Sequence, residues 1–554
     1  MKLLKFFFLF FFGFTFAQDS IPTTYFNNPI EIPLILSGSF GELRTDHFHS
    51  GLDLKTQQQE GIPIYAPADG FVNRIKVSHY GYGKALYIKH PNGYSTVYAH
   101  LKKYGDSIQK YLKNAQYKKE AYEIELFPEA DQLKVKKGDL IAYTGNSGSS
   151  EAPHLHFEIR DANSRPMNPL LFGIEIPDTK KPIVSGVFAY PLSKDAQINQ
   201  SENRVKIRLI RQKDGSYKAE NSTAFGKIGF GISTYDQQNG ASNKNGVYKI
   251  DTYCNGKEKF KIAFEKFSFA ETRYINRFID YEYFKNNKSR IQKLFRQANN
   301  PLSIIQSENE NGFIDVQDQL NYTYRIEVTD FKNNKVTISI PIKGEQLTIV
   351  KTRESSITED FIYADEATSI TKGKFNIYIP TNSFYENVYL NINAKEDTLV
   401  LHENVIPLHK SISISTDISN YNANDIDKLY IGRLNYKKEP YYNFTSRKGN
   451  KLTAYTKTLG SFVLVADSTN PKIKALNFQD NKWISKNKTL KIKITDVLSG
   501  ISSYRATING KFILMEYNYK KDVLIYDFDD QIISESENNL KLIVIDNVGN
   551  NATF

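Results

Sequence analysis

Between residues 18 and 175 the sequence alternates short apolar runs with Gly, Pro and Asn-Gly turns. Runs of about five residues bounded by such turns are typical of strands and too short for most helices. Asn92-Gly93, which lies between two of the runs, is typical of a tight hairpin. We therefore expect an antiparallel β-domain here, with strands at 62–72, 85–89, 95–99 and 139–143.

Two stretches depart from this pattern. Residues 103–132 are polar and predict an insertion with a helix around Ser107–Tyr122. The insertion could be a lid, but a solvated surface excursion is the favoured interpretation. Residues 271–297 carry apolar residues at helical spacing and predict a helical excursion within a later β-domain.

The remainder of the chain contains a weak internal repeat. Polar stretches that end in proline begin at Asp178 and again at Asp467, and each precedes strand-like sequence. Residues 324–334 and 541–550 are both alternating strands that run into an Asp-led turn. The repeat suggests two related β-sandwiches, the last of which resembles immunoglobulin-like modules of bacterial surface proteins.

The chain is thus expected to be mainly β and to contain several domains, since 554 residues suffice for three to five domains of roughly 100–200 residues. The expected parts are an export signal at 1–17, the antiparallel β-domain at 18–177, a β-sandwich with a helical excursion at 178–345, a β-rich domain of unreadable type at 346–466 and an immunoglobulin-like β-sandwich at 467–554.

The first residues resemble a secretory signal peptide. Lys2 and Lys5 precede the apolar run 6–16, and Ala17 ends a segment suited to cleavage. A retained anchor is the less favoured alternative. No later stretch approaches the roughly 18 apolar residues of a membrane span, so we expect an exported protein of the periplasm or cell envelope, or a secreted one, without a transmembrane segment after signal removal.

Charge and cysteine content narrow the class of protein further. The formal net charge of +11 suits an anionic envelope polymer. The sequence has no Arg-rich nucleic-acid motif, and the expected export also argues against nucleic acid as a partner. Cys254 is the only cysteine, so an intrachain disulfide is impossible. We interpret it as a partly buried, inert thiol. Protein partners cannot be read from the sequence.

Candidate chemistry is concentrated in the first third of the chain. Seven of the nine histidines lie between His47 and His156. Successive side chains of a strand point to opposite faces, so His154 and His156 should share one face while Leu155 and Phe157 enter the core. Imidazole and carboxylate groups are ligands of zinc.

Other groups could join this pair. His49 and Asp53 share a face if their segment is extended or helical, and His100 ends another expected strand. These four imidazoles and one carboxylate exceed the three ligands of a catalytic zinc, and spacing does not tell which residues bind. No His-Glu-x-x-His helix is present, which argues against a thermolysin-like site.

Several ordered motifs resemble the lysostaphin-type zinc endopeptidases, which include glycyl-glycine and murein DD-endopeptidases. The resemblance covers about residues 30–172 and rests on the motifs at 49–53, 98–101, 145–148 and 153–158, joined by 66–70 and 135–141. It implies an antiparallel β-sheet metallopeptidase domain. The stretch between His100 and Val135 is longer than in the family pattern, which leaves one wall of the cleft uncertain.

The resemblance also implies roles for individual residues. His49, Asp53 and His156 become ligands of Zn²⁺, and His100 and His154 become the catalytic histidines. The implied activity is zinc-dependent hydrolysis of amide bonds in peptidoglycan stem or cross-link peptides. The sequence does not tell which bond is cut, although the chain has no recognisable wall-targeting repeat and direct cross-links are therefore favoured over pentaglycine bridges.

Two other functions remain open from the sequence. The domain could be a catalytically silent regulator of other wall hydrolases, although all five site residues are intact. The long β-rich tail could instead indicate a surface or adhesion protein. The remaining histidines are interpreted as structural, with His47 near enough to His49 to support it, and 145–150 as a turn at the cleft edge rather than a phosphate loop.

Overall fold

The computed structural model describes residues 21–353, 357–422, 425–530 and 537–554, so the expected export signal lies outside the described residues. The described part is dominated by strands, as expected. Among these residues no helix is both long and apolar enough to cross a membrane. For description we call residues 21–177 the N-terminal body, 178–345 the second body, 346–466 the third body and 467–554 the C-terminal body.

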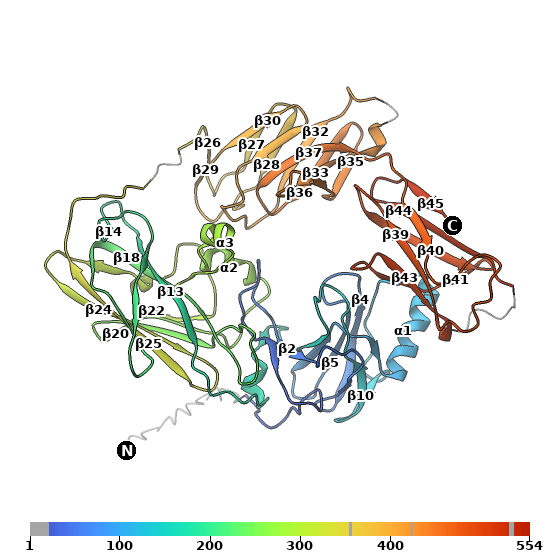
Figure 1. Cartoon of the computed structure of the whole chain (residues 1–554), viewed down its shortest axis with the longest axis horizontal. Coiled ribbons are helices and arrows are strands. Elements are labelled where there is room, and N and C mark those ends of the chain that lie inside the picture. The colour runs from blue at the N-terminus through green and yellow to red at the C-terminus, as the bar shows by residue number, and fades with distance from the viewer. Residues whose placement is uncertain (1–20, 354–356, 423–424, 531–536) are drawn as a thin grey trace, which may run out of the picture.

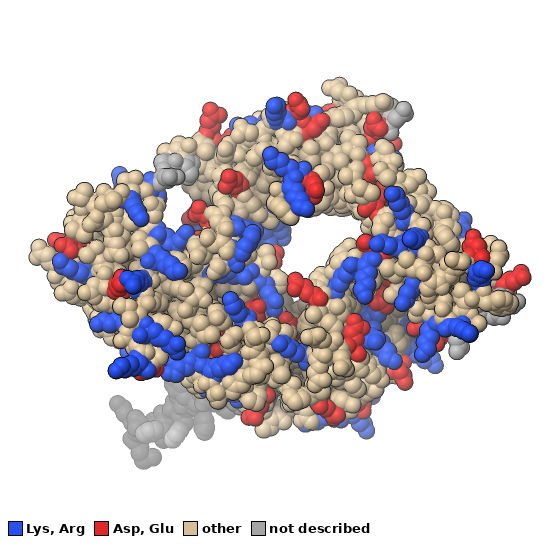
Figure 2. All heavy atoms as spheres, in the orientation of Figure 1, with Lys and Arg blue, Asp and Glu red and all other residues tan. Residues whose placement is uncertain are grey.

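The bodies follow one another around a ring, and the C-terminal body returns to lie beside the N-terminal one (Figure 1). Figure 2 shows an opening through the middle of the molecule in this view. One cluster of buried apolar side chains runs from Phe26 to Ile342, so the N-terminal and second bodies share a core. Separate clusters fill the third and C-terminal bodies.

The N-terminal body is built on an antiparallel sheet with the strand order β1-β2-β11-β6-β5-β4-β8 and a smaller sheet with the order β3-β10-β7. The Asn92-Gly93 turn joins β5 to β6, which confirms the predicted hairpin. The strands are β1 Leu36–Gly38, β2 Leu52–Lys55, β3 Pro63–Tyr65, β4 Gly70–Val77, β5 Lys84–Lys89, β6 Ser95–Ala99, β7 Lys103–Tyr104, β8 Ile124–Leu126, β9 Lys134–Val135, β10 Leu140–Tyr143, β11 His154–Arg160 and β12 Pro166–Met167.

The centre of the larger sheet determines where the candidate residues lie. Strand β11 pairs with β2 on one side and β6 on the other, in a register that sets His156 opposite Asp53 and also opposite Ala99. Leu155 and Phe157 are fully buried. The period of two therefore sends the histidines of β11 to the opposite face, as the sequence predicts.

The insertion contains the predicted helix, α1 Asp106–Lys119. Ile108, Leu112 and Gln116 are its buried residues, and their spacing of four places them on one side of the helix. Lys118 and Lys119 lie in the last turn, where their positive charges interact favourably with the negative C-terminal end of the helix dipole. The helix thus packs through one stripe against the core of the N-terminal body.

The second body combines a mixed sheet with a short helical excursion, in the main order β15-β13-β18-β25-β24-β19-β20-β22. Most neighbours are antiparallel, but β25 pairs in parallel with β17 and β18. Its strands are β13 Ile183–Pro191, β14 Gln197–Ile198, β15 Val205–Ile207, β16 Leu209–Arg211, β17 Tyr217–Ala219, β18 Ser222–Tyr235, β19 Lys249–Cys254, β20 Lys257–Ala263, β21 Gln292–Lys293, β22 Ile305–Glu308, β23 Ile314–Val316, β24 Asn321–Thr329 and β25 Lys335–Gly344. The helices are η1 Pro169–Phe172, which precedes this body, η2 Thr272–Tyr274, α2 Ile275–Phe278, α3 Tyr281–Asn287 and η3 Glu310–Gly312. Cys254 is a free, buried thiol, and burial raises its pKa.

The third body has two five-stranded sheets and a two-stranded sheet, β26-β29, around one apolar cluster. The C-terminal body has two four-stranded sheets around another. The third body contains β26 Asp360–Ile362, β27 Thr368–Lys372, β28 Phe375–Ile379, β29 Val388–Leu390, β30 Ile392–Lys395, β31 Thr398–Leu401, β32 Ile412–Asp417, η4 Ile426–Lys428, β33 Leu429–Leu434, β34 Pro440–Tyr441, β35 Thr445–Lys448, β36 Lys451–Thr456 and β37 Gly460–Ala466. The C-terminal body contains β38 Lys472–Ala475, β39 Thr489–Thr495, β40 Ile501–Ile508, β41 Lys511–Ile513, β42 Met515–Asn518, β43 Val523–Asp527, η5 Phe528–Asp530, β44 Leu540–Asp546 and β45 Asn551–Thr553.

Contacts between α1 and the C-terminal body close the ring. Lys113 Nζ forms an ion pair with the nearly inaccessible carboxylate of Asp530, and Tyr117 Oη donates to the same carboxylate at 2.5 Å. Lys84 of β5 pairs with Glu516 of β42 at 2.7 Å. The C-terminal body therefore covers part of the insertion. The favoured interpretation of the insertion as a solvated surface excursion does not hold for this part.

Candidate metal centre

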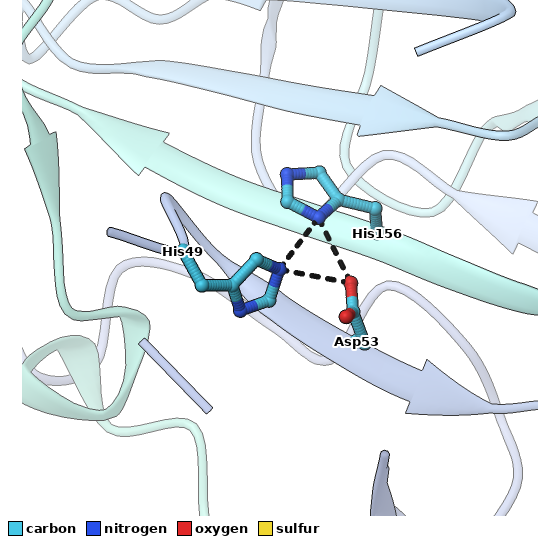
Figure 3. A group of neighbouring side chains, drawn as sticks. All are labelled: His49, Asp53 and His156. Carbon is cyan, nitrogen blue, oxygen red and sulfur yellow. Dashed lines mark hydrogen bonds and ion pairs between the residues drawn. The ribbon is translucent and has the colours of Figure 1, made fainter. Parts of the chain in front are cut away.

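Three donor atoms from two segments of the N-terminal body face one another. His49 Nε2 lies 3.0 Å from both Asp53 Oδ1 and His156 Nδ1, and His156 Nδ1 lies 2.9 Å from Asp53 Oδ1. Figure 3 shows the three side chains pointing to a common point. All three residues are more than nine-tenths buried. Two imidazoles and a carboxylate are a ligand set that suits a divalent transition metal.

In each imidazole, the nitrogen that faces away from the centre has a hydrogen-bond acceptor as its partner. His49 Nδ1 lies 2.7 Å from the carbonyl oxygen of Ser39, which can only accept a hydrogen bond. His156 Nε2 lies 2.8 Å from the carboxylate of Glu158. With a metal ion bound, each ring would donate outward and turn an unprotonated nitrogen to the centre. This is the arrangement in which histidines bind metals, so the residues fit a metal ion.

Glu158 is the residue that the sequence interpretation missed. Its carboxylate is inaccessible and accepts from His156, from Ser50 Oγ at 2.8 Å, from Arg160 Nε at 2.6 Å and from Tyr82 Oη. Burial opposes its charge, but Arg160 and His156 hold its pKa far below the usual value. Because Glu158 lies two residues after His156 on β11, the strand period alone could have indicated it.

Asp53 is held from both sides. Its Oδ1 atom belongs to the centre, while Arg44 Nη2 donates to Oδ2 at 2.9 Å. Burial alone would raise the pKa of Asp53, but His49 and hydrogen bonds from His154 and His156 lower it well below the usual value. The same carboxylate hydrogen bond, together with that of Glu158, overcomes the effect of burial on His156 and raises its pKa to about 9.

The two other candidate histidines lie beside this group and are oriented by backbone carbonyls. His154 Nδ1 lies 2.8 Å from the oxygen of Ala152, and His100 Nδ1 lies 2.9 Å from the oxygen of Ser147. Their ring centroids are 4.8 Å apart. His154 Nε2 is 3.4 Å from Asp53 Oδ1. Each ring can therefore donate through Nδ1, which leaves Nε2 turned to another partner, Asp53 in the case of His154.

His100 has an unusual backbone as well as an unusual pKa. It directly follows β6, with φ at +59°, a left-handed conformation that costs a residue with a Cβ of the order of 1 kcal/mol. Burial and the neighbouring His154 and His156 lower the pKa of His100 to about 3. Its imidazole is therefore neutral at neutral pH.

The glycine between His49 and Asp53 has a packing reason. A Cβ at Gly51 would lie 2.3 Å from the carbonyl oxygen of Phe157. Any side chain there would push the segment before β2 away from β11. The close approach that the sequence suggested for this glycine is present, and it brings His49 to His156.

The remaining histidines make local contacts. His47 pairs with Asp46 at 2.9 Å, His79 stacks on Tyr122 at 5.1 Å, and His90 bonds to Asp69 and Thr96. His402 Nδ1 accepts from the backbone of Asn391, and His409 packs against Tyr274. None of them belongs to a group of metal-binding side chains found within the described residues.

Other bodies contact both sides of the centre. The loop Gly145–Ser150, which supplies the carbonyl partner of His100, is bound by Lys520 at the oxygen of Asn146, 2.7 Å away, and by Tyr519 at the oxygen of Gly148, 3.2 Å away. On the other side, Phe48 N donates to Thr272 Oγ1 of the second body at 2.8 Å. The centre is thus framed by parts distant in sequence.

The model of the family described as Peptidase family M23 matches residues 47–117 and 128–169. Residues 47–169 are a Peptidase family M23 domain. The match contains all five candidate residues and omits 118–127, which lie in the insertion that the sequence analysis found to be longer than the family pattern. A Zu5-like domain model matches residues 359–467, in the region whose type the sequence left open.

Curated relatives resemble the chain over the M23 domain. The DD-carboxypeptidase/endopeptidase Mpg of Neisseria meningitidis is 32% identical over 136 residues, which are 24% of this chain and 25% of the relative. A protein named as an uncharacterized metalloprotease of Haemophilus influenzae is 36% identical over 137 residues, 25% of this chain and 23% of the relative. The peptidoglycan DD-endopeptidase ShyA of Vibrio cholerae is 26% identical over 200 residues, 35% and 38% of the two chains. The chain thus spans about a quarter of the first two relatives.

Proposed function

We propose that this protein is an exported zinc endopeptidase that hydrolyses amide bonds in peptidoglycan cross-link peptides. The convergence of His49 Nε2, Asp53 Oδ1 and His156 Nδ1 within 3.0 Å is the observation that carries the proposal. The three side chains would hold the zinc ion, and His100 and His154 would act as catalytic histidines. The name of the relative ShyA, a peptidoglycan DD-endopeptidase, supports peptidoglycan as the substrate, and that of Mpg, a DD-carboxypeptidase/endopeptidase, supports endopeptidase activity.

Zinc, when bound, polarises a scissile carbonyl and lowers the pKa of a coordinated water. The protein's own contribution is proton transfer by two oriented imidazoles. His100 and His154 donate through Nδ1 to fixed carbonyls and so present Nε2, where each can take a proton from the attacking water and return it to the leaving amine. Arg44 and Glu158 keep the Asp53 and His156 side chains in place.

The full chain without residues 1–17 tests the proposal directly. With zinc, we expect it to release new amino groups from purified peptidoglycan, and mass spectrometry of the muropeptides should locate the cut, which we expect in direct cross-links. Removal of zinc by a chelator should stop the release and added zinc should restore it. A zinc-loaded protein that binds peptidoglycan but frees no amino group would instead indicate the silent regulator.

Glu158→Gln should weaken zinc binding by about 10–100-fold, because the neutral amide no longer offers a carboxylate to the Nε2 proton of His156. Competition with a chromogenic chelator gives the dissociation constant. Glu151→Gln, at an exposed acid close to the site, is the matched control and should bind zinc like the wild type. Equal affinities for the two variants would remove Glu158 from the support of the centre.

A further inference from the structure

A second kind of candidate metal site occurs away from the histidines. Carboxylate oxygens of Asp178, Asp236 and Asp330 lie within 4.8 Å of one another in the second body. Within the described residues no ion pair joins any of these three carboxylates to a lysine or arginine. Repulsion among them is therefore not balanced by a basic side chain of the described chain.

The surroundings of this triad contain acceptor atoms that lack a donor. Asp236 Oδ1 and Asn245 Oδ1 are both buried without a hydrogen-bond partner. The two residues are 8% and 4% exposed. They are cross-strand neighbours, because each backbone N–H donates to the carbonyl of the other at 2.9 Å. A buried acceptor without a donor is unfavourable, so these atoms require a bound partner.

A small cavity connects these atoms. It has a volume of about 50 Å³ and is lined by the three carboxylate residues and by Asn245. Lys332 is the basic residue of its lining, and among the described residues it makes no ion pair with the triad. The cavity is large enough for an ion with a water molecule, and all of the unpartnered acceptors named above are oxygens.

We propose that Asp178, Asp236, Asp330 and the side-chain oxygen of Asn245 form a calcium site. A set of oxygen donors without nitrogen or sulfur favours a hard cation, and Ca²⁺ accepts such sets with irregular geometry and added water. Zinc prefers the nitrogen ligands of the histidine centre. This site is independent of the proposed peptidase function.

The site lies at the junction of the N-terminal and second bodies. Gln238, two residues after Asp236, donates to Leu34 O at 2.9 Å and accepts from Leu36 N at 2.8 Å. Gly246, next to Asn245, donates to Ser39 Oγ at 2.8 Å. An ion between Asp236 and Asn245 would therefore stiffen the segment that holds β1 and Ser39, whose carbonyl orients His49.

A related triad in the C-terminal body provides an internal comparison. Asp467, Asp496 and Asp546 have carboxylate oxygens within 4.8 Å of one another. The turns correspond: Asn334 N donates to Asp330 Oδ1 at 2.8 Å, as Asn550 N does to Asp546 Oδ1 at 2.8 Å. Both carboxylate oxygens of Asp467 accept backbone N–H groups, and the only unpartnered oxygen of this triad belongs to the half-buried Asp496. We therefore assign the calcium site to the first triad.

The test uses the full, zinc-loaded chain, so that the histidine centre is already filled. Isothermal titration with calcium chloride should show one tight site per chain, and calcium should raise the melting temperature by about 2–4 °C relative to a calcium chelator. Asp236→Asn should lose both effects, whereas Asp496→Asn should keep them. Two ions per chain, with one lost in each variant, would support the assignment and extend it to the second triad.

A second variant guards against misfolding. Asp178→Asn changes a half-buried side chain and should weaken calcium binding at least tenfold while its melting temperature in chelator stays that of the wild type. No calcium bound by the wild-type chain would overturn the proposal. Wild-type calcium affinity in both Asp236→Asn and Asp178→Asn would do the same, as would a loss confined to Asp496→Asn.

Discussion

His156→Ala is expected to leave the protein without tightly bound zinc and to lower peptidoglycan hydrolysis by about a thousandfold or more. His156 Nδ1 faces both His49 Nε2 and Asp53 Oδ1 at 3.0 Å or less, so the change removes one of three converging donors. Losing several kcal/mol of transition-state stabilisation by the metal corresponds to such a factor. Metal analysis after gel filtration and the rate of amino-group release measure the two effects.

His47→Ala is the control for this change, since the His47 side chain is exposed and, among the described residues, makes its polar contact with Asp46. It should keep one zinc and near-normal activity. Circular dichroism of His156→Ala against the metal-free wild type separates loss of the ligand from loss of the fold. One tightly held zinc in a folded His156→Ala chain would show that the ligand assignment is wrong.

His154→Ala should keep its zinc yet lose about 10²–10⁴-fold in kcat, the usual contribution of a positioned general acid or base. The imidazole lies outside the three converging donors, with Nε2 3.4 Å from Asp53 Oδ1. Its removal therefore takes away a proton carrier while the three donors of the centre stay. Zinc content and steady-state kinetics on the same preparation distinguish this from the effect of His156→Ala.

Ser150→Ala is a matched control for His154. Ser150 Oγ lies 3.1 Å from His154 Nδ1, but the carbonyl of Ala152 at 2.8 Å still orients the ring after the change. The activity should therefore fall less than about tenfold, as expected for one hydrogen bond among several. Near-normal turnover of His154→Ala itself would remove the catalytic role from this histidine.

The sequence predicted local structure well where a short pattern determines it. The strand at 95–99, the Asn92-Gly93 hairpin and the helix of the insertion all follow from nearest neighbours, and the structure has each of them. The helical excursion at 271–297 is broken instead into short pieces, because Ile279 is extended and Asp280 caps a new helix by accepting from Tyr283 N at 3.0 Å. Apolar spacing alone does not show such a break.

Long-range contacts could not be predicted from spacing. The nitrogen that His49 turns inward depends on the carbonyl oxygen of Ser39, ten residues earlier in the chain. The partner of His156, Glu158, lies two residues along the same strand and was within reach of the strand period. The internal repeat indicated where β-domains begin and end, but the meeting of Asp178 with Asp236 and Asp330 requires three segments folded together. Two members of each triad lie in the repeated segments, but Asp236 and Asp496 do not, and the burial and missing partners of the triads were visible only in the structure.

The ring also determines how the molecule can deform. Every junction between successive bodies is a peptide segment, so the boundary between α1, the loop Gly145–Ser150 and the C-terminal body is the place where an intact chain can part. A continuous polymer strand too large to be threaded end-first would have to enter the middle of the ring through this boundary. Since the carbonyl oxygen of Ser147 in the same loop orients His100, separation of the last body from the first would bear on the position of the His100 imidazole.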